Sequence, residues 1–193
     1  LAILPTLNKQ LALSGYCVAC ESNKNFIVDT GSNDGQNAFE YSSVNWRESL
    51  RCECCSLNNR MRASIDLFTD QLIATPSSKV YMNEQVTPLY RWAKGKFPEL
   101  IGSEYLGDEK TGGTDYEGIR HEDTTRLSLE SDSLDCVLSF DVLEHIPDYQ
   151  LAIKEIFRCL KPGGFLLLSA PFVSDNYQTR VRARLLPGGH VEH

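Results

Sequence analysis

The sequence predicts an α/β protein, in which a doubly wound and mostly parallel sheet follows a small cysteine-rich module. Three observations lead to this fold class. From residue 79 onward, short apolar runs alternate with segments of helical periodicity, the pattern of a parallel sheet with helices on its faces. One run, Asp135 to Phe140, is almost continuously apolar, as expected of a strand covered on both faces. Residues 1–57 instead combine cysteines and turn residues without sustained periodicity.

The chain has 193 residues, 41% of them hydrophobic, which is enough for one core and a satellite module. We therefore expect two domains, a four-cysteine module over residues 1–57 and an α/β domain over residues 58–193. The chain starts at Leu1 without a leader pattern and stops in a polar stretch at His193, so it is interpreted as a piece of a longer polypeptide. Further domains of that polypeptide are expected partners.

The elements of the α/β domain follow from hydrophobic spacing. Apolar residues from Leu57 to Leu72 recur at near-helical spacing and predict a first helix. A second helix is expected around Val86 to Ala93, and a third around Ile153 to Leu160. Two glycines at 163 and 164 close the third helix, because glycine supplies a left-handed cap. The predicted strands are, in order, residues 79–83, 100–105, 118–122, 135–140 and 165–170.

The acidic charge is concentrated in one part of the chain. The net charge is −7, but residues 99–148 alone hold 14 acidic and 3 basic residues. A nucleic-acid surface needs clustered lysine and arginine, so nucleic acid is not the expected partner. A cationic or hydroxyl-rich ligand fits this segment better. No apolar run reaches the ~20 residues of a membrane-spanning helix, so no membrane span is expected.

Two cysteine pairs, Cys17-Val-Ala-Cys20 and Cys52-Glu-Cys-Cys55, are separated by 31 residues. Four thiolates delivered as two C-x2-C pairs suit tetrahedral Zn²⁺, and a bound metal would stabilise a module with little core. Because all four ligands are cysteines, the predicted zinc site is structural and has no open position for catalysis. Free thiols and a redox-active pair are the alternatives, and Cys54 could replace Cys55 as a ligand. Seven cysteines suit a reduced chain better than a secreted disulfide framework, so a cytoplasmic location is expected.

Each of the first four predicted strands ends beside a carboxylate, namely Glu84, Glu104, Asp123 and Asp141. In open parallel sheets, ligands bind outside the carboxyl ends of the strands, at the point where the strand order reverses. These four acids are therefore candidates for a single ligand site.

Three blocks of sequence resemble the class I S-adenosylmethionine-dependent methyltransferases, which have a Rossmann-like fold. They are Ile119-Arg-His-Glu-Asp123, Ser133-Leu-Asp-Cys-Val-Leu-Ser-Phe-Asp-Val-Leu-Glu-His145 and Leu160-Lys-Pro-Gly-Gly-Phe-Leu-Leu-Leu-Ser-Ala-Pro171. The cysteine-rich part is similar to the zinc-knuckle extension, a zinc-ribbon-like module, of some bacterial methyltransferases that accompany glycan-processing enzymes. The resemblance implies S-adenosylmethionine as cofactor and methyl transfer to a small-molecule or glycan acceptor, at oxygen.

Site residues follow from the same resemblance. Glu104 would accept the ribose hydroxyls, because an ionised carboxylate is a suitable bidentate acceptor. Asp123 would accept from the adenine amine, while Tyr105 would cover an adenine face. The full set of implied cofactor-binding residues is Glu84, Glu104, Tyr105, Leu106, Asp123, Thr124, Phe140 and Asp141.

His145 is the candidate general base, which would remove a proton from an oxygen acceptor. A histidine in the first turn of a helix can equally be a packing residue, and Asp141 with Glu144 also fits a helix-capping box. The first-strand loop, Tyr81 to Thr87, departs from the family because it has no glycine. A non-catalytic, zinc-stabilised scaffold or regulatory module with a degenerate cofactor site is therefore the alternative function. Too few residues follow the fifth strand for the family's two further strands, so a sheet truncated at its C-terminal side is expected.

Overall fold

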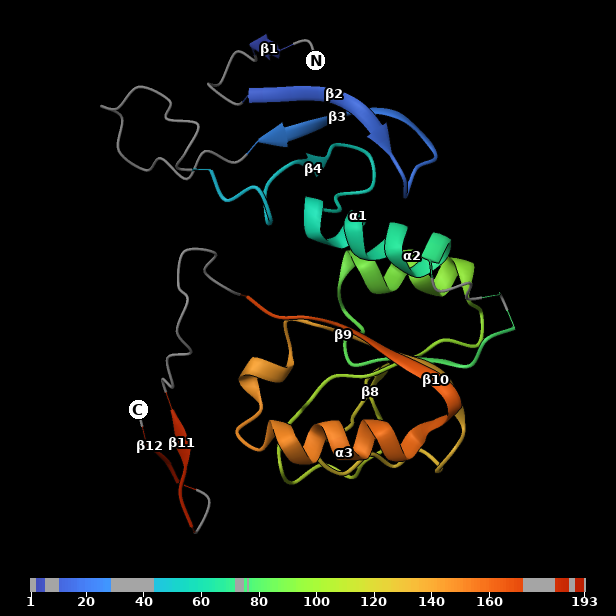
Figure 1. Ribbon diagram of the computed structural model, residues 1–193, viewed down its shortest axis with the longest axis vertical. Helices are drawn as coiled ribbons and strands as arrows, with labels where there is room; N and C mark the ends of the chain where they lie inside the picture. The colour runs from blue at the N-terminus through green and yellow to red at the C-terminus, as the bar shows by residue number, and fades with distance from the viewer. Residues whose placement is uncertain are drawn as a thin grey trace. The chain divides into compact units, whose positions relative to one another are not determined.

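Figure 1 shows the chain as a computed structural model, which describes residues 3–5, 11–28, 44–71, 75, 77–171, 183–187 and 190–192. The chain divides into two compact units, Leu1–Ala74 and Thr75–His193, whereas the sequence predicts a boundary between residues 57 and 58. The helix that follows the second cysteine pair accounts for the difference. Its residue Arg62 donates hydrogen bonds to the carbonyl oxygens of Leu50 and Leu57, which ties this helix to the cysteine-bearing segment.

The first unit contains an antiparallel sheet in the order β1-β2-β3-β4. Its strands are β1 (Ile3–Pro5), β2 (Leu11–Cys17), β3 (Ser22–Val28) and β4 (Arg51–Cys52). Ala12, Phe26 and Val28 are buried, so the unit has apolar core residues that the sequence analysis did not predict. Four polar residues open β3 before its first apolar one, so the strict alternation that signals a half-buried strand is missing.

One helix completes the described part of the first unit. Helix α1 (Asn59–Asp66) starts after Asn58, whose side-chain oxygen accepts a hydrogen bond from the backbone N–H of Met61 at 2.9 Å. This cap satisfies an N–H group that has no partner within the helix. A π-helical turn, η2 (Leu67–Gln71), continues α1. Ile65 and Phe68 are buried, as the predicted helical spacing requires.

The second unit is built on a parallel sheet in the order β10-β9-β5-β6, which confirms the predicted doubly wound α/β fold. Its strands are β5 (Val80–Met82), β6 (Ile101–Gly102), β9 (Leu134–Phe140) and β10 (Leu160–Ser169). The chain runs from β5 to β6 on one side and returns to β9 on the other. The strand order therefore reverses between β5 and β9, which is where such sheets bind ligands.

Two helices cover this sheet. Helix α2 (Pro88–Lys96) connects β5 to β6, and α3 (Tyr149–Cys159) lies between β9 and β10 in the chain; Figure 1 shows them on opposite faces. Tyr81 and Val137 pack with Ile156 of α3 in one core cluster. Their neighbours Val80 and Met82 are also fully buried and point to the other face, because side chains alternate along a strand. Strands β5 and β9 are thus buried on both sides, as their apolar sequences predict, whereas the edge strand β10 is partly exposed.

The predicted third strand, residues 118–122, has a different structure. β7 (Asp115–Tyr116) and β8 (Ile119–Arg120) form an antiparallel hairpin, and a parallel bridge from Glu104 to His121 joins this segment to the end of β6. Gly118, with a φ of +85°, lies in the turn of the hairpin. A glycine-assisted turn therefore replaces half of the expected strand. A second two-stranded pair, β11 (Arg184–Leu185) with β12 (Val191–Glu192), lies near the C-terminus.

The fifth strand starts five residues earlier than the sequence predicts, because the Lys-Pro-Gly-Gly segment lies within β10. The pairing of β10 with β9 shifts register between Leu160 and Phe165. Gly164 is required here, since a Cβ atom would lie 3.0 to 3.2 Å from three backbone carbonyl oxygens. Gly163 has a φ of +83°, which favours glycine. Helix α3 ends at Cys159 with Leu160 as its C-cap, so the two glycines form an irregular strand start and not the predicted helix cap.

Candidate functional site

A cavity of about 770 Å³ lies over the carboxyl ends of β5, β6 and β9, within the second unit. Cavities of roughly 300 to 1,000 Å³ are typical of cofactor and small-molecule sites. The predicted residues that line it are Glu84, Glu104, Tyr105, Asp123, Thr124, Phe140, Asp141 and His145. Leu106 is the exception among the predicted set. Its backbone N–H donates to Nδ1 of the buried His121 at 3.0 Å, and it does not line the cavity.

Glu104, which follows β6, is hydrogen-bonded to the loop after β5. Its Oε1 accepts hydrogen bonds from the backbone N–H groups of Gln85 at 2.7 Å and Val86 at 3.0 Å, both in the loop after β5. The Gln85 side chain in turn accepts from the backbone N–H of Arg120 and donates to the carbonyl oxygen of Gly118. The glycine-free loop is thus held by Glu104 and by the β7–β8 hairpin. Oε2 of Glu104 is the carboxylate oxygen left for a ligand.

Asp123 lies in the loop after β8, where its Oδ1 accepts from the backbone N–H and the hydroxyl of Thr125 at 2.9 and 2.7 Å. No other described residue hydrogen-bonds Oδ2 of this side chain, so that oxygen is left for a ligand. The neighbouring Glu122 is buried and has a structural role instead. It accepts from Arg120 at 2.7 Å and from the backbone N–H of Ser128 at 2.9 Å.

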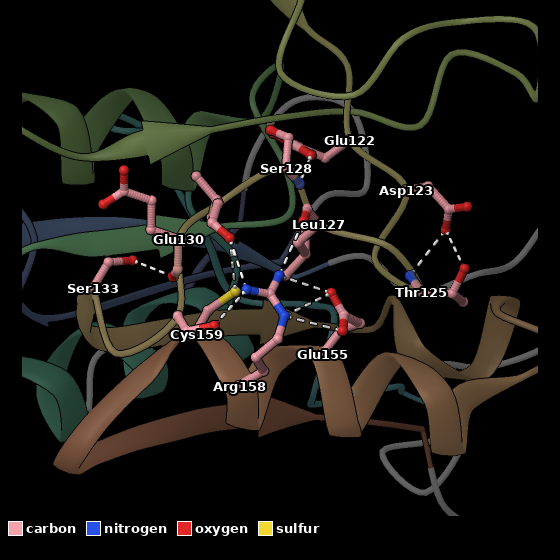
Figure 2. A network of polar contacts seen from close by, with 12 residues as sticks. Glu122, Asp123, Thr125, Leu127, Ser128, Glu130, Ser133, Glu155, Arg158 and Cys159 are labelled. Atoms are coloured by element: carbon pink, nitrogen blue, oxygen red, sulfur yellow. Dashed lines mark hydrogen bonds and ion pairs between the residues drawn. The ribbon is translucent and has the colours of Figure 1, made fainter.

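A second residue fixes the same loop from α3, as Figure 2 shows. The Arg158 guanidinium donates to the carbonyl oxygens of Leu127 at 3.0 Å and Leu129 at 2.9 Å. It also pairs with Glu155 at 2.8 Å, and this contact lowers the pKa of the Glu155 carboxyl. Leu127 is buried, so the loop is held by both packing and hydrogen bonds.

Asp141 follows directly on β9 and has a φ of +57°, a backbone conformation that non-glycine residues rarely adopt. Its Oδ1 accepts from the Ser169 hydroxyl at 3.0 Å, and its backbone N–H donates to the Ser169 carbonyl at 2.9 Å. Such strained residues cluster at ligand sites. The preceding residue, Phe140, is buried and forms an apolar part of the wall.

Asn83, at the end of β5, is a lining residue that the sequence analysis missed. It is 7% exposed, and its Nδ2 donates to the hydroxyl of the buried Ser139 at 3.1 Å. Its Oδ1 is buried and has no hydrogen-bond partner among the described residues. The position itself was the available signal, because Asn83 is the last residue of the first predicted strand.

The cavity is strongly acidic. Seven carboxylates line it, and among its described lining residues there is no lysine or arginine. Three further acids that the sequence analysis did not select, Asp108, Glu122 and Asp148, belong to this set. Asp148 also caps α3 through Leu151, and Asp108 accepts from the hydroxyl of Tyr105. That hydrogen bond raises the pKa of Tyr105 to about 12, so the ring stays neutral at physiological pH.

Two exposed side chains complete the lining. Tyr105 is 58% exposed, with its ring 5.7 Å from that of His121, so one face is available for stacking. His145 ends the short 3-10 helix η3 (Leu143–His145) and is exposed at the cavity. An exposed imidazole at this position argues against the alternative reading of His145 as a core packing residue.

The four cysteines selected from the sequence lie together in the first unit. Their sulfur atoms are all within 4.8 Å of one another, with Cys17 to Cys55 at 3.8 Å and Cys20 to Cys52 at 4.0 Å. A tetrahedral Zn²⁺ with Zn–S bonds of about 2.3 Å separates its sulfur ligands by about 3.8 Å. The donor set therefore fits zinc in number, chemistry and spacing. Cys54 is exposed and lies outside this group.

One of the four cysteines, Cys52, is placed to be a thiolate. Burial raises the pKa of Cys52, but the backbone N–H groups of Cys55 and Cys54 that point at its sulfur outweigh this, so its pKa lies below its ordinary value. Burial instead raises the pKa of Cys55 to about 11 and also raises that of Cys20. Thiolate is the form that binds metal.

Among the described helices, none has the length and hydropathy that a membrane crossing needs.

Comparisons with known proteins agree with this geometry. Residues 103–168 match the family described as "Methyltransferase domain". A protein of Mycolicibacterium smegmatis named "Probable S-adenosylmethionine-dependent methyltransferase" is 43% identical over 53 residues, or 28% of this chain and 21% of that protein. A demethylmenaquinone methyltransferase of Staphylococcus aureus strain MRSA252 is 35% identical over 81 residues, or 39% of this chain and 34% of that protein.

The matches with these curated relatives span only about a fifth to a third of their length. Among solved structures, a chain in the complex of the Haloferax volcanii Trm112 methyltransferase activator with a methyltransferase is 19% identical, at a TM-score of 0.43. The match covers 57% of this chain and 53% of that one. The family match falls on β9, α3, β10 and the segment that carries Glu104 and Asp123. Residues 103–168 thus match a methyltransferase domain and resemble parts of S-adenosylmethionine-dependent methyltransferases.

Proposed function

We propose that the second unit binds S-adenosylmethionine in the acidic cavity and transfers its methyl group to a small-molecule or glycan acceptor, at an oxygen atom. The observation that carries this proposal is the cavity at the reversal of strand order, lined by the strand-end acids and by Asn83, whose Oδ1 is buried without a partner among the described residues. The cofactor carries two positively charged groups, a sulfonium and an ammonium. The carboxylates of the cavity and the unpaired Oδ1 of Asn83 are suited to binding such cations.

The residues present fit this cofactor. Oε2 of Glu104 would accept the ribose hydroxyls, since Oε1 is already bonded to two backbone N–H groups. Oδ2 of Asp123 would accept from the adenine amine, and the exposed ring of Tyr105 would cover one adenine face. Asn83 Oδ1 and Asp141 would hold the ammonium end. Glu84, Thr124 and Phe140 would complete the wall around it.

S-adenosylmethionine supplies a methyl group already activated by its sulfonium, so the protein mainly positions the reactants and excludes water. The acceptor oxygen must lose its proton during transfer. His145, exposed at the cavity, would take that proton as general base. Val142, Ile146 and Pro147 beside it form an apolar lining that would keep water from the acceptor.

Titration calorimetry with S-adenosylmethionine and S-adenosylhomocysteine, on the longest available polypeptide, tests cofactor binding. Glu104→Gln keeps an oxygen for the two loop N–H groups but removes a carboxylate acceptor, so we expect at least a tenfold loss of affinity. Glu99→Gln is the matched control, because Glu99 is exposed and does not line the cavity. Equal affinities in the two variants would mean that the ribose site is misplaced.

The acceptor is tested with radiolabelled S-adenosylmethionine and two acceptor panels, hydroxyl-bearing glycans and amines of similar size. Methylation of the glycans, reduced by His145→Ala in rate but not in cofactor affinity, is the expected result. Methylation of amines alone would overturn the choice of oxygen.

We also propose that Cys17, Cys20, Cys52 and Cys55 hold one structural Zn²⁺ in the first unit. The sulfur spacing supports this, and four cysteine ligands leave no position for a reacting water. Atomic absorption on purified protein should give about one zinc per chain.

The seven thiols suit a reducing compartment, so the cytoplasm is the proposed location. Further domains of the same polypeptide are the proposed partners.

The alternative is a non-catalytic, zinc-stabilised scaffold or regulatory module. It is favoured by one observation, that the N–H groups of Gln85 and Val86 are bonded to Glu104 and so do not point at a ligand carboxylate. Absence of binding to both S-adenosylmethionine and its demethylated product, with zinc present, would select this alternative.

A further inference from the structure

We propose that Arg62 is the charge partner and positioning residue of the four-cysteine site, holding both ends of the second cysteine pair and offsetting the negative charge of the metal and its thiolates. This inference rests on the zinc site proposed above. It concerns a residue of α1 that is outside the four ligands and outside both cysteine motifs.

The hydrogen bonds of Arg62 close the loop that carries the second pair. Nη1 donates to the carbonyl oxygen of Leu57 at 2.8 Å and to that of Leu50. These residues flank the segment Arg51–Ser56, and the Leu57 carbonyl also accepts from the backbone N–H of Cys52 at 2.9 Å. Arg62 therefore holds both ends of the segment that carries Cys52 and Cys55. Both bonds come from the same nitrogen, Nη1, and Nη2 donates separately to Asn59 Oδ1.

Arg62 is also a buried cation without an ionised partner among its described contacts. It is 8% exposed, and its side-chain hydrogen bonds end on the two carbonyl oxygens and on Asn59 Oδ1 at 3.3 Å, all of them neutral. The guanidinium lies 4.2 Å from the centre of the Phe26 ring. A buried charge is strongly unfavourable unless something nearby compensates it.

The same Phe26 residue also packs against the cysteine cluster. Phe26 is paired with Cys52 in the β3–β4 register and packs in one buried cluster with Cys17 and Cys52. Zn²⁺ with four thiolates carries a formal charge of −2, which the nearby guanidinium reduces to −1. The pKa of Arg62 shows both effects: burial lowers it, and electrostatic attraction to the four cysteines opposes that lowering.

Two consequences follow from this arrangement. Removing the guanidinium should weaken zinc binding, because the metal–thiolate charge loses its compensation. By thermodynamic linkage, zinc should stabilise the docking of α1, which carries Arg62.

The test compares zinc dissociation constants of full-length variants, measured by competition with a chromophoric chelator. Arg62→Gln should weaken zinc binding at least tenfold. Arg60→Gln is the matched control on the same helix, since Arg60 already has an ion pair with Glu48 at 3.0 Å, and it should stay within twofold of the original protein. An Arg62→Gln constant within twofold of the original would overturn the proposal and leave Arg62 as a packing residue.

Arg62→Lys keeps the positive charge but removes the guanidinium group, so it tests the role of the charge alone. It also tests the proposal if Arg62→Gln does not fold. It keeps the cation, so zinc affinity within about threefold of the original is expected. A tenfold loss in Arg62→Lys would overturn the charge role. If the original protein binds no zinc at all, the metal site itself fails, a result distinct from any of these.

Discussion

Asn83 has the most informative single atom in the second unit. Its Oδ1 is buried in the cavity wall without a partner among the described residues, while its Nδ2 is fixed by Ser139. Leaving a buried polar atom unpaired costs about 1 to 3 kcal/mol. A donor from a bound ligand, such as an ammonium group, would remove that cost. This oxygen therefore lowers the stability of the unliganded protein and would contribute to ligand binding.

Asn83→Leu should separate these two effects. Leucine has a similar size and removes the unpaired oxygen, but it also removes the partner of the buried Ser139 hydroxyl. Because these two changes have opposite effects on stability, the thermal unfolding temperature should change little. S-adenosylmethionine affinity should fall at least tenfold by calorimetry, because the acceptor for the ammonium group is lost. Ser139→Ala serves as the control, since it removes the partner of Asn83 and should lower stability. Unchanged affinity in Asn83→Leu would exclude this atom from the cofactor site.

At this scale, residue type and position in the strand were enough to select the acids of the cavity. Glu104 and Asp123 were chosen because they follow predicted strands, and they line the same cavity. Leu106, which the resemblance also implies as a cofactor-binding residue, does not line the cavity. Its backbone N–H bonds to His121 beside a long-range bridge, a contact that sequence spacing does not reveal. Asp148 and Asp108 were missed because they do not directly follow a predicted strand, and only the fold brings them to the cavity.

At the scale of elements, Arg158 of α3 controls the loop that carries Asp123. Its bond to the carbonyl of Leu127, drawn in Figure 2, and its bond to that of Leu129 join two elements separated by about 30 residues in the chain. We expect Arg158→Ala to destabilise the protein by about 1 to 3 kcal/mol, because it leaves these carbonyls without their guanidinium partner. Hydrogen exchange should become faster between residues 123 and 133.

Lys154→Ala provides the control for Arg158→Ala, because Lys154 is an exposed residue on the same helix. It should change neither unfolding temperature nor exchange. If both variants behave alike, the loop is held by the burial of Leu127 and not by the guanidinium.

Helix α2 approaches β6 closely enough to require a glycine. A Cβ atom at Gly102 would lie 2.2 Å from the ring of Tyr90. Gly102→Ala should therefore lower the free energy of unfolding by about 1 to 3 kcal/mol through overpacking. Denaturant titration measures this, and combination with Tyr90→Leu should recover part of the loss. Loss without recovery in the double variant would contradict a steric cause.

Helices were more predictable than short strands. The periodicity around Val86 to Ala93 located α2, whose capping residue Thr87 and first-turn Pro88 are also visible in the sequence. The third strand was only partly right, because residues 118–122 contain a turn glycine and pair mainly within a hairpin. Pairing is decided by partners distant in the chain, which local spacing does not encode.

For the whole molecule, alternation of apolar runs was sufficient to predict a parallel sheet covered on both faces. The boundary between the units was less predictable. Helix α1 has the amphipathic spacing of a helix from the α/β domain, yet Arg62 attaches it to the cysteine-bearing unit. The composition changes at residue 57, just after the second cysteine pair, whereas the contacts divide the chain after Ala74.

The two units should respond separately to their ligands. Cys17 and Cys52 are almost fully buried beside Phe26, so metal removal would leave the first unit with four thiols in place of a central cross-link. In scanning calorimetry of the zinc-loaded chain, a chelator should therefore lower or abolish the transition of the first unit only. S-adenosylhomocysteine at 100 times its dissociation constant should stabilise the second unit by about 2.7 kcal/mol, with or without zinc. A single transition that shifts with both ligands would show that the units unfold together.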